Sequence, residues 1–275
     1  MTYTSLMVHC ELGQSNETTL RCASDLAARF KLHVIGIAVA QPLQMMLGDY
    51  YISAGSVDDD SKVIEAKAAA TEAEFRRILQ PHASQLSWRW ATVFGTPATY
   101  LAQHACGADF LMTSASADGA TGTQRPVSVG DLILLSGRPV MIVPVGPVSH
   151  KFDHILVGWK DTREARRAVA DALPLLKKAA QVTVVQIAAE VNLHEVRAKL
   201  AEVARWFKGH SIDAEMVASP STGHDAKSFD TIAQRQHADL IVAGAYGHSR
   251  LREWAFGGFT SELMHPKERC VFVSH

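Results

Sequence analysis

Short runs of apolar residues alternate along the whole chain with longer stretches in which apolar residues return every three or four positions. Residues 32–39 are mostly apolar, which is typical of a strand covered by helices on both faces. Residues 16–30 show the helical spacing. This alternation predicts a parallel sheet with helices packed on it. In the first half we predict strands at 6–10, 32–39, 88–93, 108–113 and 139–143, and helices at 16–30, 61–82 and 97–105.

The second half repeats the same order of elements. Residues 238–242 (ADLIV) match residues 108–112 (ADFLM) of the first half, and each segment precedes the last strand of its half. An internal duplication explains this better than one large domain does. In the second half we predict strands at 154–159, 181–187, 212–217, 238–243 and 270–273, and helices at 162–180, 193–208, 226–236 and 261–264, with Thr162 as the cap of the first of these helices.

Two tandem α/β domains follow from this repeat, each a doubly wound, five-stranded parallel sheet with a Rossmann-like arrangement. We expect them to span residues 1–147 and 152–275, with a link at 144–152 that contains proline and glycine. The first domain is longer mainly at 41–61, which we interpret as a polar loop. Its acidic run, 58–60, is expected to lead into the next helix.

Composition and charge narrow the class of protein. The 275 residues carry 27 basic and 28 acidic side chains, a formal net charge of −1, which gives no electrostatic footprint for nucleic acid or an anionic membrane. The N-terminus lacks the pattern of a signal peptide, and no apolar run is long enough to cross a bilayer. The four scattered cysteines predict buried, reduced thiols and a cytoplasmic protein. The thirteen histidines form no metal-binding spacing, so we expect no metal site.

Ligands of doubly wound sheets bind beyond the carboxyl ends of the strands, where the winding direction reverses. In the second half, the loop after the fourth strand is rich in glycine and leads into a helical run. Glycines let the backbone approach a ligand, and successive N–H groups followed by a helix N-terminus attract an anion. The alternative is that Gly244 and Gly247 only turn the chain and that Gly257-Gly258 relieves crowding at a helix start. The loop matches neither the P-loop nor the GxGxxG pattern.

The spacing of these glycines resembles the nucleotide-binding signature of the universal stress protein family. Gly244-x-x-Gly247 is followed, after nine residues, by Gly257, and the segments 238–243 and 270–273 resemble the fourth and fifth strands of that family. The resemblance is strong over 152–275 and weaker over 5–146. It implies a tandem member of the family with the adenine nucleotide α hydrolase-like fold. The implied ligand is ATP or ADP, with or without Mg.

The resemblance also assigns site residues in this sequence. Main-chain groups of the loop would hold the phosphates, at Gly244, Gly247, His248, Gly257, Gly258, Phe259 and Thr260. Residues that follow the first strand or end the second would flank the nucleoside, at Gly158, Trp159, Lys160 and Ile187.

Two of these positions depart from the family pattern. Lys160 stands where an acidic residue is usual; it either contacts a phosphate, marks a different ligand, or is a solvated loop residue. Gly258 stands where a hydroxyl residue is usual, although Thr260 lies close by. The missing hydroxyl would cost about 0.5–1.5 kcal/mol of binding free energy, which weakens binding without abolishing it.

The first half has no such loop at the equivalent place. Gly119 and Gly122 lie too far along the chain and no paired glycines follow, so we expect no complete nucleotide site there. This half would serve as the partner of a pseudo-dimer within the chain. His9 and Cys10 follow its first strand, but adjacent strand residues point to opposite faces and do not form a catalytic pair. Exposed edge strands leave a homodimer of two whole chains open.

Three functions are consistent with these patterns. The leading interpretation is a stress-response binding and signalling module, whose second half binds an adenine nucleotide and whose ligand state affects an unknown protein partner. No residues have the spacing of a catalytic site, so we assign none and expect at most slow ATP hydrolysis. The second is a nucleotide-free scaffold, which Lys160 and Gly258 favour. The third is an adenylyl-transfer enzyme, against which the absence of an SGGxD-type motif argues.

Overall fold

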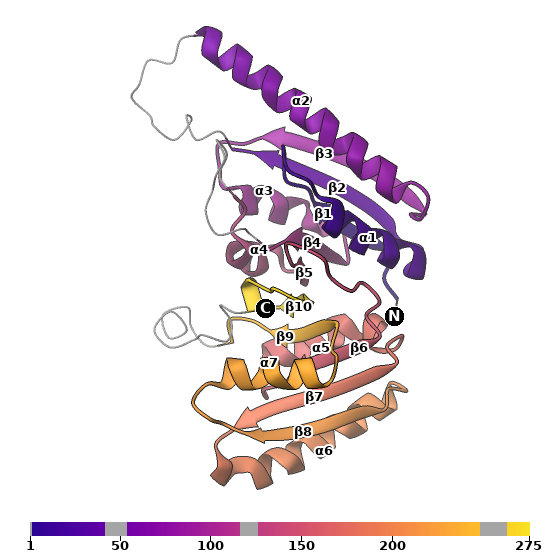
Figure 1. Cartoon of the computed structure of the whole chain (residues 1–275), viewed down its shortest axis with the longest axis vertical. Helices are drawn as coiled ribbons and strands as arrows, with labels where there is room; N and C mark the ends of the chain where they lie inside the picture. Colours follow the sequence, from indigo (N-terminus) through magenta and orange to yellow (C-terminus); the bar gives the residue numbers. More distant parts are fainter. Residues whose placement is uncertain (1, 42–53, 116–125, 248–262) are drawn as a thin grey trace. The chain divides into compact units, whose positions relative to one another are not determined.

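The computed structural model describes residues 2–41, 54–115, 126–247 and 263–275, and the chain divides into two compact units, 2–145 and 146–275. In both units strands and helices alternate along the chain (Figure 1). The first unit contains β1 (Ser5–His9), α1 (Glu17–Phe30), β2 (His33–Ala40), α2 (Ala54–Leu79), β3 (Gln85–Thr92), α3 (Pro97–His104), the 3-10 turn η2 (Ala105–Gly107), β4 (Phe110–Ser114), α4 (Val129–Ser136) and β5 (Val140–Val143). The second contains β6 (His154–Gly158), α5 (Arg163–Leu176), β7 (Gln181–Ala188), the 3-10 turn η3 (Glu190–Asn192), α6 (Leu193–Gly209), β8 (Ala214–Pro220), α7 (Asp225–Arg235), β9 (Leu240–Gly244) and β10 (Cys270–Ser274).

The strands of each unit follow the same spatial order. The order is β3-β2-β1-β4-β5 in the first unit and β8-β7-β6-β9-β10 in the second, and neighbouring strands within a unit run parallel. In the first unit α1 packs against α2, and α3 packs against α4. In the second, α7 crosses in front of the sheet in Figure 1, whereas α5 and α6 lie behind it. The predicted α/β class with doubly wound, five-stranded parallel sheets is confirmed.

The pairing register also repeats between the units. β1 places Leu6 beside Phe110 of β4, and β6 places Ile155 beside Leu240 of β9. The side chains of these central strands are buried, since helices cover both faces of each sheet.

The repeated Ala-Asp pair has the same structural role in both units. Asp109 accepts hydrogen bonds from the backbone N–H groups of Thr4 (2.6 Å) and Ser5 (3.0 Å), just where β1 begins. Asp239 accepts the equivalent bonds at the start of β6, from the N–H groups of Asp153 (3.0 Å) and His154 (3.2 Å). The sequence similarity between residues 108–112 and 238–242 therefore reflects a repeated contact that fixes the first strand of each unit to its fourth.

Helix α2 begins earlier than predicted. We expected a loop through residue 61, but the helix already starts at Ala54 and includes the acidic run 58–60. The run therefore lies within the helix rather than preceding it. The edge strands β3 and β8 also differ from the predicted bounds by one to three residues at their ends, which is the usual uncertainty of element boundaries.

The cysteines agree only in part with the expectation of buried thiols. All four are free; Cys10, Cys22 and Cys270 are buried, but Cys106 is exposed. Cys106 lies in the turn η2 and therefore outside the sheet that buries the others. Among the described helices, none has the length and apolar character needed to cross a membrane.

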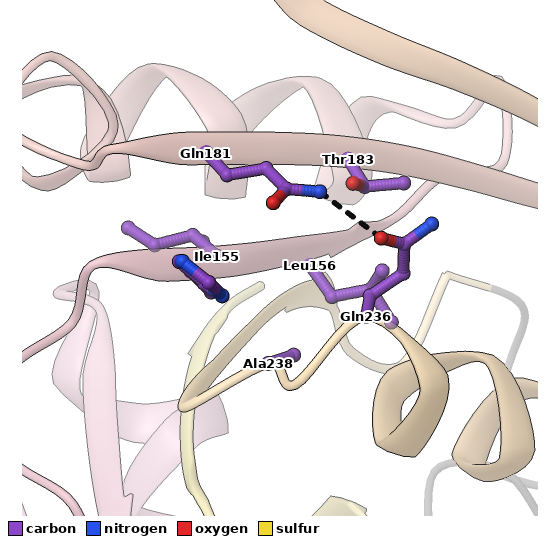
Figure 2. A pocket seen from close by; sticks show the side chains of 7 residues that line it. Ile155, Leu156, Gln181, Thr183, Gln236 and Ala238 are labelled. Carbon is purple, nitrogen blue, oxygen red and sulfur yellow. Dashed lines mark hydrogen bonds between the residues drawn. The ribbon is translucent and has the colours of Figure 1, made fainter.

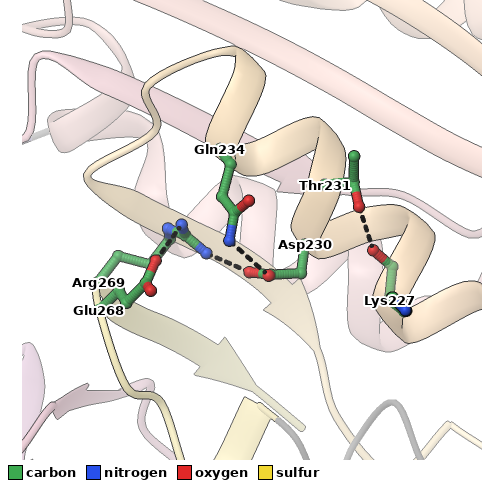
Figure 3. A network of polar contacts seen from close by, with 6 residues as sticks. All are labelled: Lys227, Asp230, Thr231, Gln234, Glu268 and Arg269. Carbon is green, nitrogen blue, oxygen red and sulfur yellow. Dashed lines mark hydrogen bonds and ion pairs between the residues drawn. The ribbon is translucent and has the colours of Figure 1, made fainter.

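A polar network fixes the start of β10 to α7 (Figure 3). The guanidinium of Arg269, which is only 9% exposed, donates to Asp230 of α7 and to Glu268. Gln234, one turn further along α7, donates to the same Asp230 carboxylate at 3.0 Å. Because a buried cation requires a hydrogen-bonded partner, this network joins helix and strand firmly.

Candidate functional site

The winding direction of the second sheet reverses at β6, which lies between β7 and β9. At its carboxyl end Gly158 pairs with Val185 of β7 and with Ala243 of β9. Gly244 ends β9 directly beyond this point, and the glycine loop follows it. The structure therefore brings three predicted residues, Gly158, Gly244 and Gly247, to the edge where doubly wound sheets bind ligands.

Gly244 allows the first turn of α5 to lie against β9. A β-carbon at this position would lie 2.5 Å from the backbone nitrogen of Ala165 and 2.6 Å from the carbonyl carbon of Glu164. Such distances are far below van der Waals contact, and the backbone of a helix cannot move aside. The first glycine of the motif, Gly244, is therefore required because α5 packs closely against β9. This reason could not be recognised from the sequence.

Gly247 faces a side chain instead of a backbone. A β-carbon there would lie 2.9 Å from Oε2 of Glu164 and 3.7 Å from Oγ1 of Thr162. Between the two glycines, Tyr246 has φ +62°, the left-handed region that non-glycine residues seldom adopt. Strain of this kind is common at ligand-binding loops. Ala245 holds the loop start in place, donating its N–H to the carbonyl of Ser274 at 2.9 Å.

Glu164 belongs to this site and was missed from the sequence. Thr162 caps α5, as predicted, with Oγ1 accepting the N–H of Ala165 at 3.3 Å. Glu164 follows in the first turn and is only 2% exposed. Its Oε1 accepts a hydrogen bond from Nε of Arg163, but its Oε2 has no partner among the residues that the structure describes.

The Glu164 carboxyl is charged despite its burial. Burial acts to raise its pKa, but the hydrogen bonds from Arg163, from its own backbone N–H and from Thr162 outweigh that effect, so the pKa falls below its usual value. The sequence shows only an acidic residue in a first helical turn, which is common, so nothing in it could have revealed the unpaired oxygen.

The residues predicted to flank the nucleoside lie on the same edge. Trp159 directly follows β6 and donates its backbone N–H to the carbonyl of Val185 at 2.8 Å, which places it beside Gln186 of β7. Both side chains are half-buried, and neither Nε1 of Trp159 nor Oε1 of Gln186 has a partner in the described part of the chain. Lys160 is exposed, and Ile187 is half-buried near the end of β7. Gln186 is a second residue that the sequence analysis missed.

Gly158 is covered on one face by α7. A β-carbon there would lie 3.3 Å from the ring of Phe229, a contact that the sequence did not reveal. The remaining predicted residues, His248, Gly257, Gly258, Phe259 and Thr260, lie outside the described residues.

A shallow surface depression lies at the other end of the strands (Figure 2). It is lined by residues at the starts of β6 and β7 and by the turn after α7. Its amides bond to each other, because Nε2 of Gln181 donates to Oε1 of Gln236 at 3.0 Å. The depression is therefore separate from the carboxyl edge where Gly158 and Gly244 meet.

In the part of the chain that the structure describes, no three His, Cys, Asp or Glu side chains lie together as metal ligands would. In the first unit His9 and Cys10, the pair rejected as a catalytic couple, are both buried. Burial lowers the pKa of His9 to about 4 and raises that of the Cys10 thiol, so at neutral pH neither is charged. Ser128 caps α4 by accepting the N–H of Asp131, and the acidic side chain of Asp131 lies in the first turn.

Comparison with known proteins adds evidence on the fold. No protein-family model matches the sequence, and no curated protein does. Among solved structures, a universal stress protein from Archaeoglobus fulgidus DSM 4304 is similar over 98% of this chain and 97% of its own, with TM-score 0.74 and 15% identity. A functionally unknown protein from Pseudomonas aeruginosa PAO1 is similar over 99% of this chain and 92% of its own, with TM-score 0.61 and 15% identity. The predicted resemblance is thus confirmed at the level of architecture: this chain has the tandem fold of a universal stress protein.

Proposed function

We propose that this chain is a stress-response binding module of the universal stress type, whose second unit binds ATP or a related adenine nucleotide. The ligand would lie at the carboxyl ends of strands β6 and β9. Its presence would change the binding of the protein to a protein partner in the cytoplasm. The tandem fold supports the family, and the site supports the ligand. The chain would act by binding rather than as a dedicated catalyst, since the described residues offer no nucleophile with an oriented base at this edge.

The observation that carries this proposal is a set of unpaired polar atoms at the winding reversal. Nε1 of Trp159, Oε1 of Gln186 and Oε2 of Glu164 are buried without a partner among the described residues. An unpaired buried donor or acceptor costs about 1–3 kcal/mol, so native proteins rarely retain several of them without a reason. A bound nucleoside, which carries both donors and acceptors, would satisfy them.

In this proposal different groups of the chain bind different parts of the ligand. Trp159 and Gln186 offer a donor and an acceptor to the nucleoside, and the backbone from Gly244 to Gly247 begins the loop that would hold phosphate. Exposed Lys160 supplies a cation beside the same strand end. Mg²⁺ would arrive with the phosphates, because the described residues contain no acidic cluster of their own for it.

Thermal unfolding with and without millimolar Mg-ATP tests the proposal. A ligand present at about a hundred times its Kd stabilises the folded state by about 2.7 kcal/mol, which would raise Tm by roughly 5–10 °C. Gly247→Trp should abolish this rise, because the added ring enters the space beside Glu164. Gly209→Trp is the matched control, since a β-carbon at Gly209, the last residue of α6, meets no other atom within 4 Å. It should retain the full rise.

Other results select other functions. If Tm responds neither to millimolar Mg-ATP nor to millimolar AMP, the proposal fails and the scaffold interpretation, favoured by exposed Lys160, takes its place. Release of pyrophosphate at a rate well above the uncatalysed one would instead indicate adenylyl transfer. A rise in Tm that persists in Gly247→Trp would move the ligand away from the glycine loop.

A further inference from the structure

We propose that the buried carboxylate of Glu164 determines the charge of the ligand that the second unit accepts, disfavouring a phosphate beside Gly247 and favouring an uncharged hydroxyl or amino group there. The unit would then prefer adenosine or AMP to ATP. This inference rests on the proposed function, because it concerns the same edge of the second sheet.

The geometry directs one oxygen of Glu164 at the glycine loop. A β-carbon at Gly247 would lie 2.9 Å from Oε2 but 3.6 Å from Cδ, so the oxygen is the nearer atom and faces the loop. The other oxygen, Oε1, is engaged by the guanidinium of Arg163, whose side chain is 82% exposed. The side chain as a whole is 2% exposed. An unpaired, buried acceptor therefore lies directly against Gly247.

The negative charge at this oxygen opposes phosphate binding. The N-terminus of α5 would otherwise attract an anion, but Thr162 and Glu164 of the same chain already satisfy it. Charges in a poorly solvated site interact far more strongly than they do in water. A phosphate bound on the side of Gly247 that faces Glu164 would lie close to the unpaired Oε2, and each further phosphate would add to the repulsion.

The same oxygen requires a donor. A carboxylate oxygen accepts but never donates, so a ligand hydroxyl or amino group can satisfy it whereas a phosphate oxygen cannot. The hydrogen bonds that lower the Glu164 pKa keep this acceptor charged at neutral pH. Glu164 would then be a specificity-determining residue, contributing a favourable contact to one class of ligand and an unfavourable one to the other.

Calorimetric titration of the full chain with adenosine, AMP, ADP and ATP tests this inference. In the unaltered protein, affinity should fall as phosphates are added. Glu164→Gln, which keeps the shape and removes the charge, should raise the affinity for ATP by roughly ten- to a hundredfold and change that for adenosine much less. Glu164→Asp keeps the charge and should keep the original order of affinities.

Asp161→Asn is the matched control, because Asp161 is exposed on the same loop and paired with Arg166 at 2.9 Å. It removes one negative charge without touching the buried oxygen and should leave the order of affinities unchanged. An equal gain in ATP affinity in Asp161→Asn and Glu164→Gln would overturn the inference, since net charge alone would then explain it.

Two further results separate this inference from the proposed function. If the unaltered protein binds ATP more tightly than AMP, the inference fails while the binding function stands, and this holds even if Glu164→Gln does not fold. If none of the four compounds binds the unaltered protein, the proposed function fails and the inference fails with it.

Discussion

The two units differ at the equivalent edge of their sheets, where the carboxyl ends of the strands lie. In the first unit side chains fill it: Nδ1 of buried His9 lies 3.0 Å from Oγ1 of Thr113, and Ser114 donates to Glu11 at 2.8 Å. By strand register, the second unit has Gly158, Ala243 and Gly244 in place of His9, Thr113 and Ser114. There the backbone of α5 approaches the strand directly, and the polar side chains that remain are left unpaired.

The length of one loop accounts for Gly244. Residues 10–16 separate β1 from α1, whereas only residues 159–162 separate β6 from α5. The shorter loop starts α5 directly over the end of β9, where a side chain at residue 244 would collide with Ala165. The second unit thus has a candidate ligand edge at which the start of α5 excludes a side chain at residue 244, whereas in the first unit His9 contacts Thr113 and Ser114 bonds to Glu11 at the equivalent place.

Exchanging the equivalent residues Gly244 and Ser114 between the two units should produce the largest change in the free energy of unfolding. Gly244→Ser introduces a side chain within 2.6 Å of helix backbone, and overpacking against atoms that cannot move should cost about 3 kcal/mol or more of the free energy of unfolding. The reverse change, Ser114→Gly, removes one hydrogen bond and adds backbone freedom, which together cost about 1–2 kcal/mol. Urea unfolding followed by circular dichroism measures both. Equal losses would show that α5 does not restrict residue 244 more than the first unit restricts residue 114.

The sequence predicted the architecture well because strand and helix patterns are local and repeated. The cap at Thr162 and the equivalence of residues 108–112 with 238–242 both depend on short segments, and both are confirmed. The start of α2 was missed, since an acidic run is compatible with a loop and with a helix alike.

The site was only partly predictable. Gly158 and Gly244 were placed correctly at one edge by the rule for doubly wound sheets. The reason for Gly244 could not be found, because it depends on how far α5 lies from β9 in space. Glu164 and Gln186 were missed for the same cause: whether a polar atom has a partner depends on residues distant in the sequence.

The His9 side chain should make the first unit sensitive to acid in a way that the second unit, with Gly158 there, is not. Burial lowers the His9 pKa to about 4 in the folded state, while the unfolded chain has a value near 6.5. The unfolded state therefore binds a proton first, and folding stability is lost as pH falls from about 6.5 toward 4. At pH 4.5 this loss is about 2.5 kcal/mol relative to pH 7.

Urea unfolding of the wild type and of His9→Gln at pH 7 and pH 4.5 measures the contribution of His9 alone. The contributions of the other titratable groups are the same in both proteins and cancel when the two free energies of unfolding are subtracted. The variant should be less stable than the wild type at pH 7 and should approach or exceed it at pH 4.5. His82→Gln, on the exposed turn after α2, is the matched control and should follow the wild type at both values. A constant difference between wild type and His9→Gln would mean that His9 takes up a proton as readily in the folded protein as in the unfolded chain, so that burial does not lower its pKa.

Asp109 and Asp239 occupy equivalent positions in the two units, and substitutions of these residues should show the smallest difference between the units. Burial acts to raise the pKa of both carboxyls, but at Asp109 the bonds from Thr4 and Ser5 prevail and the pKa falls, whereas at Asp239 burial prevails and the pKa rises. Charged Asp109 therefore stabilises folding at neutral pH, and this contribution is lost as pH falls through its lowered folded-state pKa. The contribution linked to the proton on Asp239 is instead present at low pH and lost as pH rises.

Asp109→Ala should accordingly cost about 2 kcal/mol at pH 7, and Asp239→Ala about 1 kcal/mol, because the second substitution also relieves an unfavourable buried charge. Toward pH 3 the cost of Asp109→Ala should shrink while that of Asp239→Ala grows, so the two losses converge or cross. Urea midpoints of both variants across this range measure the trend. If the two costs instead stay parallel at every pH, the two carboxyls bind protons alike in the folded protein, and the opposite pKa shifts expected for Asp109 and Asp239 are wrong.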